Sequence, residues 1–200
     1  CFYYCSNLTS IPTGLFDRNT KVTDFEYCFE SCYNLTSIPT GLFDKNINVT
    51  SFYCCFQDCS TLESIPERLF DKNIEVEAFN ACFSHCTNLK EIPKGLFDKN
   101  KKATNFMRCF SFCSNVTLNK NIFSNEGNTD RFSGMNMLFN YCFQNAGEQN
   151  ENPGEAPELW KYERGSSTWN TTGCFYNAKA TNLTSDNKYN TEWGTPLNWN

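Results

Sequence analysis

The chain has 200 residues, of which 16% are aromatic and 13 are cysteine, and its formal net charge at pH 7 is −5. This charge, without a sizeable cluster of basic residues, argues against nucleic acid as a partner. No apolar run approaches the roughly 18 residues that a membrane-spanning helix needs, so we expect no membrane span in this fragment. The chain opens inside a repeat at Cys1, which indicates a fragment that lacks its targeting segment. We expect a monomer.

A repeat with a period of 27 residues runs through most of the chain. Self-similarity at a fixed period between about 20 and 50 residues is typical of a solenoid, whose units bury their apolar positions by stacking on one another. Four columns of the repeat keep one residue type without any gap: Leu8, Leu35, Leu62 and Leu89; Ile11, Ile38, Ile65 and Ile92; Pro12, Pro39, Pro66 and Pro93; Phe16, Phe43, Phe70 and Phe97. The sequence therefore predicts one elongated solenoid.

Each repeat begins with two segments that are typical of short regular elements. In the second repeat, Cys28, Phe29 and Cys32 place apolar side chains at positions i, i+1 and i+4, which predicts a short helical turn. Residues 34–38, Asn-Leu-Thr-Ser-Ile, predict a short strand. Pro39 ends this strand, because proline lacks the N–H group that a strand ladder needs.

A second helical turn and a second extended segment complete the repeat. The turn is predicted at residues 40–45, and Asn46 is suited to close it because asparagine tolerates the left-handed conformation. The extended segment is predicted at residues 49–52. The residues expected to point inward are Cys28, Phe29, Cys32, Leu35, Ile38, Leu42, Phe43, Val49 and Phe52.

The order Cys-x-Asn-Leu-x-x-Ile-Pro, an apolar pair, Val-x-x-Phe and then Cys-Phe-x-x-Cys resembles the BspA-like leucine-rich repeat of bacterial surface proteins. The resemblance implies an α/β repeat solenoid, namely a right-handed leucine-rich-repeat superhelix with short parallel strands and short helical turns. It also implies adhesion or host-protein binding at a cell surface. This repeat is longer than those of the family, because it carries an extra Gly-Leu-Phe-Asp-Lys-Asn turn.

The repeat pattern loosens after Cys113 and returns in a degenerate form at Cys174 and Phe175. Residues 147–167, rich in Glu, Asn, Gly and Pro, predict an irregular loop. The four tryptophans all lie in the last quarter: Trp160, Trp169, Trp193 and Trp199. We interpret them as a cap over the apolar end of the solenoid, with a platform that stacks on sugar rings as the alternative. The repeats thus cover residues 1–145, and the loop, degenerate repeat and cap of the same solenoid cover residues 146–200.

Most cysteines fall into two columns of the repeat: Cys1, Cys28, Cys55, Cys82 and Cys109 in one, and Cys5, Cys32, Cys59, Cys86, Cys113 and Cys142 in the other. A residue type dictated by the repeat is typical of a core filler, since a free cysteine packs as a small hydrophobe. The alternative is a run of disulfides between neighbouring repeats, because stacked strands lie about 4.8 Å apart, within the Cα separation that a disulfide accepts. Both interpretations stay open.

No group of residues in the sequence suggests catalysis, a metal site or a cofactor. His85 is the only histidine and precedes Cys86, but no third group is evident that would orient it as a base. The cysteine pairs lie beside phenylalanine without a recurring histidine, which argues against zinc. Residues 125–130 have the composition of a calcium loop but not the ligand spacing of an EF-hand. We therefore predict a protein that is not an enzyme and has no metal or cofactor.

The outward positions beside the core leucine and isoleucine of each repeat form the best candidate for a binding surface. These positions carry Thr9, Ser10, Thr36, Ser37, Glu63, Ser64, Lys90 and Glu91. We predict a recognition or adhesion module, secreted or held at the cell surface, that binds a protein or glycan of a host or neighbouring cell. The alternative is a structural spacer or stalk within a longer surface repeat protein.

Overall fold

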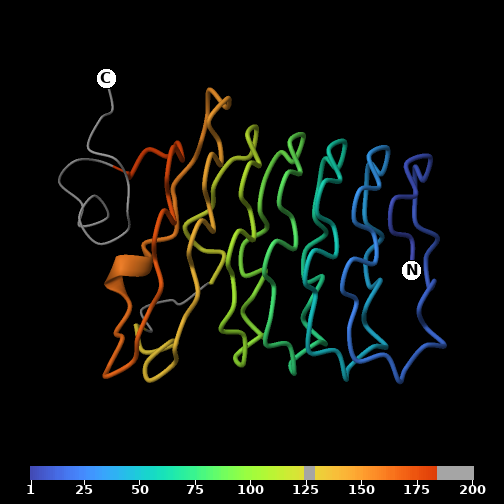
Figure 1. Ribbon diagram of the computed structural model, residues 1–200, viewed down its shortest axis with the longest axis horizontal. Helices are drawn as coiled ribbons and strands as arrows, with labels where there is room; N and C mark the ends of the chain where they lie inside the picture. The colour runs from blue at the N-terminus through green and yellow to red at the C-terminus, as the bar shows by residue number, and fades with distance from the viewer. Residues whose placement is uncertain (124–128, 184–200) are drawn as a thin grey trace.

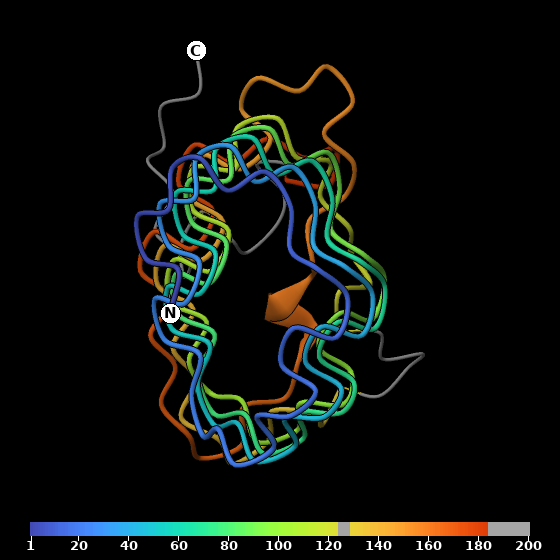
Figure 2. The ribbon, with the colours of Figure 1, turned by 90° about the vertical axis from the view of Figure 1, so that its right-hand side faces the viewer.

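The chain winds into successive coils that lie side by side along one axis in the computed structural model, which describes residues 1–123 and 129–183 (Figure 1). Seen along that axis, the coils superpose as an elongated ring (Figure 2). Residues 27 positions apart pair between neighbouring coils, as Ser51 does with Ala78. The predicted solenoid and its period are therefore confirmed. The described residues contain no helix long and apolar enough to cross a membrane.

Regular secondary structure is nearly absent from these coils. The single helix of the described residues is the short 3-10 helix η1 (Leu159–Lys161), and parallel pairing is limited to isolated bridges. The helical turns predicted at residues 28–32 and 40–45 are reverse turns instead, in which Cys32 N–H donates to the carbonyl of Phe29 at 3.3 Å. The predicted α/β detail of strands and helical turns is thus not confirmed.

The most continuous line of parallel bridges follows the second extended segment rather than the first. Its members are Asp24, Ser51, Ala78, Asn105, Leu138 and Asn170. The strand predicted at residues 34–38 contributes a single bridge, from Ser37 to Ser64. Pairing cannot extend farther there, because Pro39 and Pro66 have no N–H group to donate.

Two left-handed residues shape the segment that was expected to be helical. Tyr27 has a φ of 56° and Ser31 a φ of 58°, and the same positions of later coils also have positive φ. Alternate N–H groups then donate to carbonyls of the next coil at 2.8–3.0 Å: Phe25 to Ser51, Tyr27 to Tyr53, Phe29 to Cys55 and Ser31 to Gln57. These donors point along the solenoid axis, so they cannot form the i to i−4 bonds of an α-helix. We call residues 24–32 and their repeats the turn wall.

Asparagine forms a buried ladder at the position that was expected to be left-handed. The side-chain amide of Asn73 donates to the carbonyls of Phe43 at 3.1 Å and Asn46 at 2.9 Å, and Asn46 and Asn100 do the same in their coils. Asn46 does not have a positive φ, so the prediction that it is left-handed is wrong. The positive φ of this turn lies five residues earlier, in the column of Gly14, Gly41, Arg68 and Gly95.

Phenylalanine rings stack in columns through the core. In the longest column, consecutive rings have centroids 5.2–5.8 Å apart and lie within 12° of parallel. Its members are Phe2, Phe29, Phe56, Phe83, Phe110, Phe143 and Phe175. All nine residues of the second repeat that were predicted to point inward are buried, with at most 6% of their surface exposed. The core assignment is confirmed.

The two described tryptophans pack at the C-terminal end of the solenoid. Trp169 lies 5.6 Å from the ring of Phe139, and Trp160 lies 6.1 Å from that of Phe175. Leu159 of η1 is fully buried beside them. These contacts fit the predicted cap, whereas Trp193 and Trp199 lie outside the described residues. The division of the chain at residues 145 and 146 stays a prediction.

Candidate functional site

The cysteine side chains are free thiols, and only Cys1 and Cys5 among them are exposed. Four thiols of the second column donate to a phenylalanine carbonyl of the preceding coil, as Cys59 does to Phe29 at 3.2 Å. Burial raises the pKa of the Cys32 thiol to about 11 and that of Cys113 to about 12. These thiols therefore stay protonated at neutral pH, which makes them packing groups and poor nucleophiles.

His85 and Cys86 do not form a catalytic pair. His85 is exposed, and its ring stacks on that of Phe112 at 4.6 Å and 16°. The thiol of Cys86 is buried and donates to the carbonyl of Phe56 at 3.2 Å. Across residues 1–123 and 129–183, no three His, Cys, Asp or Glu side chains gather as metal ligands. Most of the predicted calcium-like segment, residues 125–128, lies outside the described residues.

The eight predicted binding residues are all exposed: Thr9, Ser10, Thr36, Ser37, Glu63, Ser64, Lys90 and Glu91. The backbone keeps the coils in register here, because the N–H groups of Thr36, Glu63 and Lys90 donate to the equivalent carbonyl of the preceding coil. Thr36 donates to Thr9 at 3.4 Å, Glu63 to Thr36 at 3.1 Å and Lys90 to Glu63 at 3.0 Å. The residues form two lines along the solenoid, one through Thr9, Thr36, Glu63 and Lys90 and the other through Ser10, Ser37, Ser64 and Glu91. Both lines lie between the leucine and the isoleucine that each repeat packs into the core. We call residues 35–38 and their repeats the row wall.

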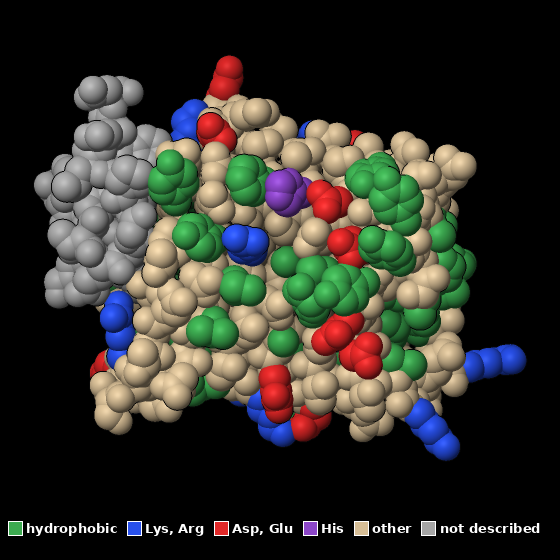
Figure 3. Space-filling view, viewed as in Figure 1, with side chains coloured by type: hydrophobic (Ala, Val, Ile, Leu, Met, Phe, Trp, Pro, Cys, Tyr) green, Lys and Arg blue, Asp and Glu red, His purple; other side chains and the backbone are tan. Residues whose placement is uncertain are grey.

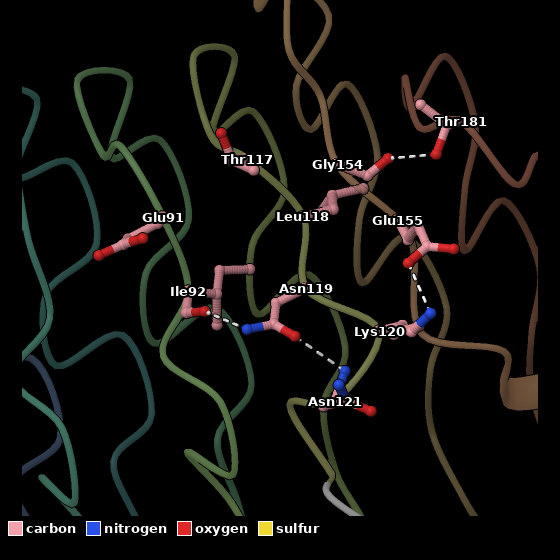
Figure 4. A pocket seen from close by; sticks show the side chains of 10 residues that line it. All are labelled: Glu91, Ile92, Thr117, Leu118, Asn119, Lys120, Asn121, Gly154, Glu155 and Thr181. Atoms are coloured by element: carbon pink, nitrogen blue, oxygen red, sulfur yellow. Dashed lines mark hydrogen bonds and ion pairs between the residues drawn. The ribbon is translucent and has the colours of Figure 1, made fainter.

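The row wall ends in a shallow groove of about 290 Å³ (Figure 4). Glu91 is the one predicted residue that lines it. The ion pair between Lys120 and Glu155, at 2.7 Å, crosses the groove, and Asn119 donates to the carbonyl of Ile92 at 3.2 Å. Sequence reasoning missed Lys120, Asn119 and Glu155, because the repeat pattern is lost in this part of the chain.

A second hollow, of about 340 Å³, lies in the turn wall. Its lining includes His85, Arg108 and Phe112, which differ in residue type from the same positions of other coils. The histidine is visible near the middle of this face, flanked by acidic, basic and apolar side chains (Figure 3). The sequence identified His85 as a variable position but gave no sign of a hollow, which depends on how neighbouring coils stack.

Comparison with known proteins does not assign this chain to a family. No family model matches it, and no curated protein matches it. Among solved structures, similarity extends to the leucine-rich repeat domain of APL1, with 18% identity over 56% of this chain and 26% of that chain and a TM-score of 0.41. TLR13 in its complex with ssRNA13 gives 13% identity, 60% and 20% coverage, and a TM-score of 0.30.

A leucine-rich repeat protein from Bacteroides ovatus gives 18% identity over 55% of this chain and 34% of that chain, with a TM-score of 0.22. The chain thus spans about a third or less of each of these three structures. Two of them are leucine-rich repeat proteins, the class that the sequence resembles. Likeness at this level establishes neither the fold nor the family, and BspA-like membership stays a proposal.

Proposed function

We propose that this chain is a non-enzymatic recognition module of the leucine-rich-repeat kind, related to the BspA-like proteins. It acts outside the cell or at its surface and binds a protein or glycan of a host or neighbouring cell. The observation that carries this proposal is the row wall, where two lines of exposed polar side chains repeat at the spacing of the coils. A surface that repeats in this way contacts an extended partner at several points, so that affinity is spread over several coils.

The charge of the row wall changes along the solenoid, which supports recognition of a partner bound in one orientation. Thr9 and Thr36 carry no charge, whereas Glu63, Lys90 and Glu91 do. None of these three charged side chains forms an ion pair within the described part of the chain. Their charges are therefore available to a partner, where complementary charge contributes mainly to specificity and to the rate of association.

The thiols are compatible with a location outside the cell. Disulfide exchange requires a thiolate that a partner can reach, and burial denies both conditions to eleven of the cysteines. The buried thiols therefore survive in an oxidising compartment without forming bridges, although such compartments favour disulfides. Cys1 and Cys5 are the two thiols that solvent can reach.

Charge reversal on the row wall tests the proposal. The chain is screened against immobilised host matrix proteins and a glycan array, and the triple variant Glu63→Lys, Lys90→Glu, Glu91→Lys is compared with the wild type on each ligand found. We expect binding to weaken by at least about tenfold, since the reversed charges oppose the partner's. The control variant Glu67→Lys, Lys94→Glu reverses exposed charges outside the two lines and should bind normally.

If the wild type binds neither the proteins nor the glycans, or if the triple variant binds as well as the wild type, the row wall is not the binding surface. A blank on both screens would favour the alternative function, a structural spacer or stalk. The unbroken columns of the core would serve that role equally well.

A further inference from the structure

The hollow in the turn wall lies where one coil contributes two small side chains beside the longer Gln57 and Arg108 of its neighbours. Ala81 and Ser84 form its floor and are only 7% and 4% exposed. In the following coil the same two positions carry Arg108 and Ser111, and the preceding coil presents Gln57. The hollow therefore depends on which coils are neighbours. Its volume of about 340 Å³ is at the small end of the range for ligand sites.

Two stacked aromatic rings form one side of the hollow. The rings of His85 and Phe112 stack in near-parallel planes, and Phe112 remains 36% exposed. An aromatic face carries the negative part of the ring's quadrupole, and it favours contact with weakly positive C–H groups. Such C–H groups line one face of a pyranose ring. The exposed part of the Phe112 ring thus suits a ligand ring that presents C–H groups on its face and polar groups at its edge.

The rest of the lining offers hydrogen-bond donors on the side nearer the C-terminal coils. The guanidinium of Arg108 lies over the ring of Tyr141 at 5.5 Å and forms no ion pair among the residues that the structure describes. Gln144 accepts from the hydroxyl of Ser111 at 3.4 Å, which leaves its amide N–H groups without a partner in the described structure. These groups are ready to donate to a ligand.

Acceptors lie on the side nearer the N-terminal coils. Gln57 lines the hollow there, and its side-chain oxygen accepts from the thiol of Cys54 at 3.0 Å. Its amide nitrogen donates to the carboxylates of Glu30 at 3.3 Å and Asp58 at 3.1 Å, which lie behind the lining. A cation would be opposed by Arg108, which lines the hollow, and an anion by these two carboxylates, which lie one hydrogen bond beyond its lining. A hydroxyl group both donates and accepts, so it suits both sides at once.

We propose that this hollow binds a neutral sugar ring, which packs one face on the exposed part of the His85–Phe112 stack and hydrogen-bonds through its hydroxyl groups to both sides. The site goes beyond the proposed function of the row wall, because it belongs to the other long side of the coil. Figure 3 shows the turn wall with the N-terminal coils on the right, whereas Figure 4 shows the row-wall groove with those coils on the left. The two surfaces therefore face away from each other.

The test is titration of the whole chain with sugars by calorimetry and by ligand-observed NMR. The probes are the neutral methyl glycosides of glucose, galactose, mannose and N-acetylglucosamine, with glucuronic acid and glucosamine as charged counterparts. We expect at least one neutral glycoside to bind more tightly than both charged sugars. Phe112→Ala should weaken that binding by at least about tenfold, since it removes the exposed ring on which the sugar packs.

The matched control is Tyr4→Ala, which removes an exposed aromatic side chain from the same column and the same left-handed conformation, away from the hollow. Tyr4→Ala should leave sugar binding unchanged. The row-wall triple variant should also leave it unchanged, so the experiment tests the hollow independently of the row wall. The proposal is overturned if no neutral glycoside binds, if Phe112→Ala and Tyr4→Ala have equal effects, or if a charged sugar binds best. Thermal unfolding of each variant confirms that the fold is retained.

Discussion

Raising the pH above about 9 under reducing conditions should unfold this protein within roughly one pH unit. Burial raises the pKa of eleven thiols, for example that of Cys54 to about 12, whereas an exposed cysteine has a pKa near 8.5. Below about pH 8.5 both the folded and the unfolded chain keep these protons, so the stabilisation is fully present. Above that pH the unfolded chain loses protons that the folded chain retains, and stability falls.

The size of this effect follows from the number of thiols. Each one lowers the free energy of unfolding by about 1.4 kcal/mol per pH unit between its unfolded and folded pKa values. Eleven thiols together give at most about 15 kcal/mol per pH unit, reached where all of them are still protonated in the folded chain, and this is as large as the entire stability of a typical domain. Lysines and tyrosines titrate higher, near pH 10, and cannot account for an onset at pH 9.

Urea unfolding curves between pH 7 and pH 10, followed by tryptophan fluorescence, measure this dependence. As a control, Cys82→Ala should reduce the pH slope by the contribution of one proton, because Cys82 is fully buried. Thiols of the denatured, unreduced protein are counted in parallel. A shallow slope together with fewer than roughly ten titratable thiols would mean that the cysteines form a ladder of disulfides.

Phe79→Ala should lower the free energy of unfolding by about 3–5 kcal/mol. The ring of Phe79 is fully buried and lies within 5.8 Å of four others, those of Phe52, Phe70, Phe97 and Phe106. Its removal leaves a cavity in the middle of a stacked column, which the two neighbouring coils can close only by moving their own rings.

Phe112→Ala is the matched control for stability, because it makes the same substitution at a ring that is 36% exposed. We expect it to change the free energy of unfolding by less than about 1 kcal/mol. Urea denaturation of both variants at pH 7 gives the comparison. Equal losses in the two variants would contradict the assignment of Phe79 to the core.

The sequence predicted the core of the solenoid well and its local backbone poorly. Inward positions such as Leu35 and Phe52 follow from the period, since a residue type that recurs every 27 positions marks a buried column. The spacing of Cys28 and Cys32 does not distinguish a helical turn from a pair of reverse turns, because either conformation can bury both side chains. The left-handed residues Tyr27 and Ser31 decide between the two, and neither type favours positive φ.

Asn46 and Arg68 show why the left-handed position of the second turn was misplaced. Asparagine tolerates positive φ, but Asn46 instead uses its amide to bond two carbonyls of the preceding coil. The left-handed position is a glycine in the first, second and fourth repeats. The third repeat has Arg68 there, with a φ of 61°, so the glycine does not recur in every repeat. The tertiary hydrogen bonds of the ladder outweigh the local preference of the residue.

The two candidate surfaces differ in how far the sequence predicts them. The row wall follows from the sequence, because Thr36 and Ser37 lie between the buried Leu35 and Ile38 and must face outward. The hollow in the turn wall depends on which coil places a short side chain beside longer ones, as Ala81 does. That comparison needs the stacking of the coils, which the sequence alone does not supply.

The central claim is that the repeated residues of the coils form the core, while recognition depends on the residues that differ between coils. Removal of one whole coil tests it most directly. Deletion of residues 24–50 joins Thr23 to Ser51, the bridge partner of Asp24, and leaves Glu63, Lys90 and the hollow in place. We predict that circular dichroism and urea denaturation show a folded, cooperative protein that keeps its ligands. Deletion of residues 24–36, about half a period, should unfold the chain. If both deletions leave an equally unfolded chain, the account is wrong.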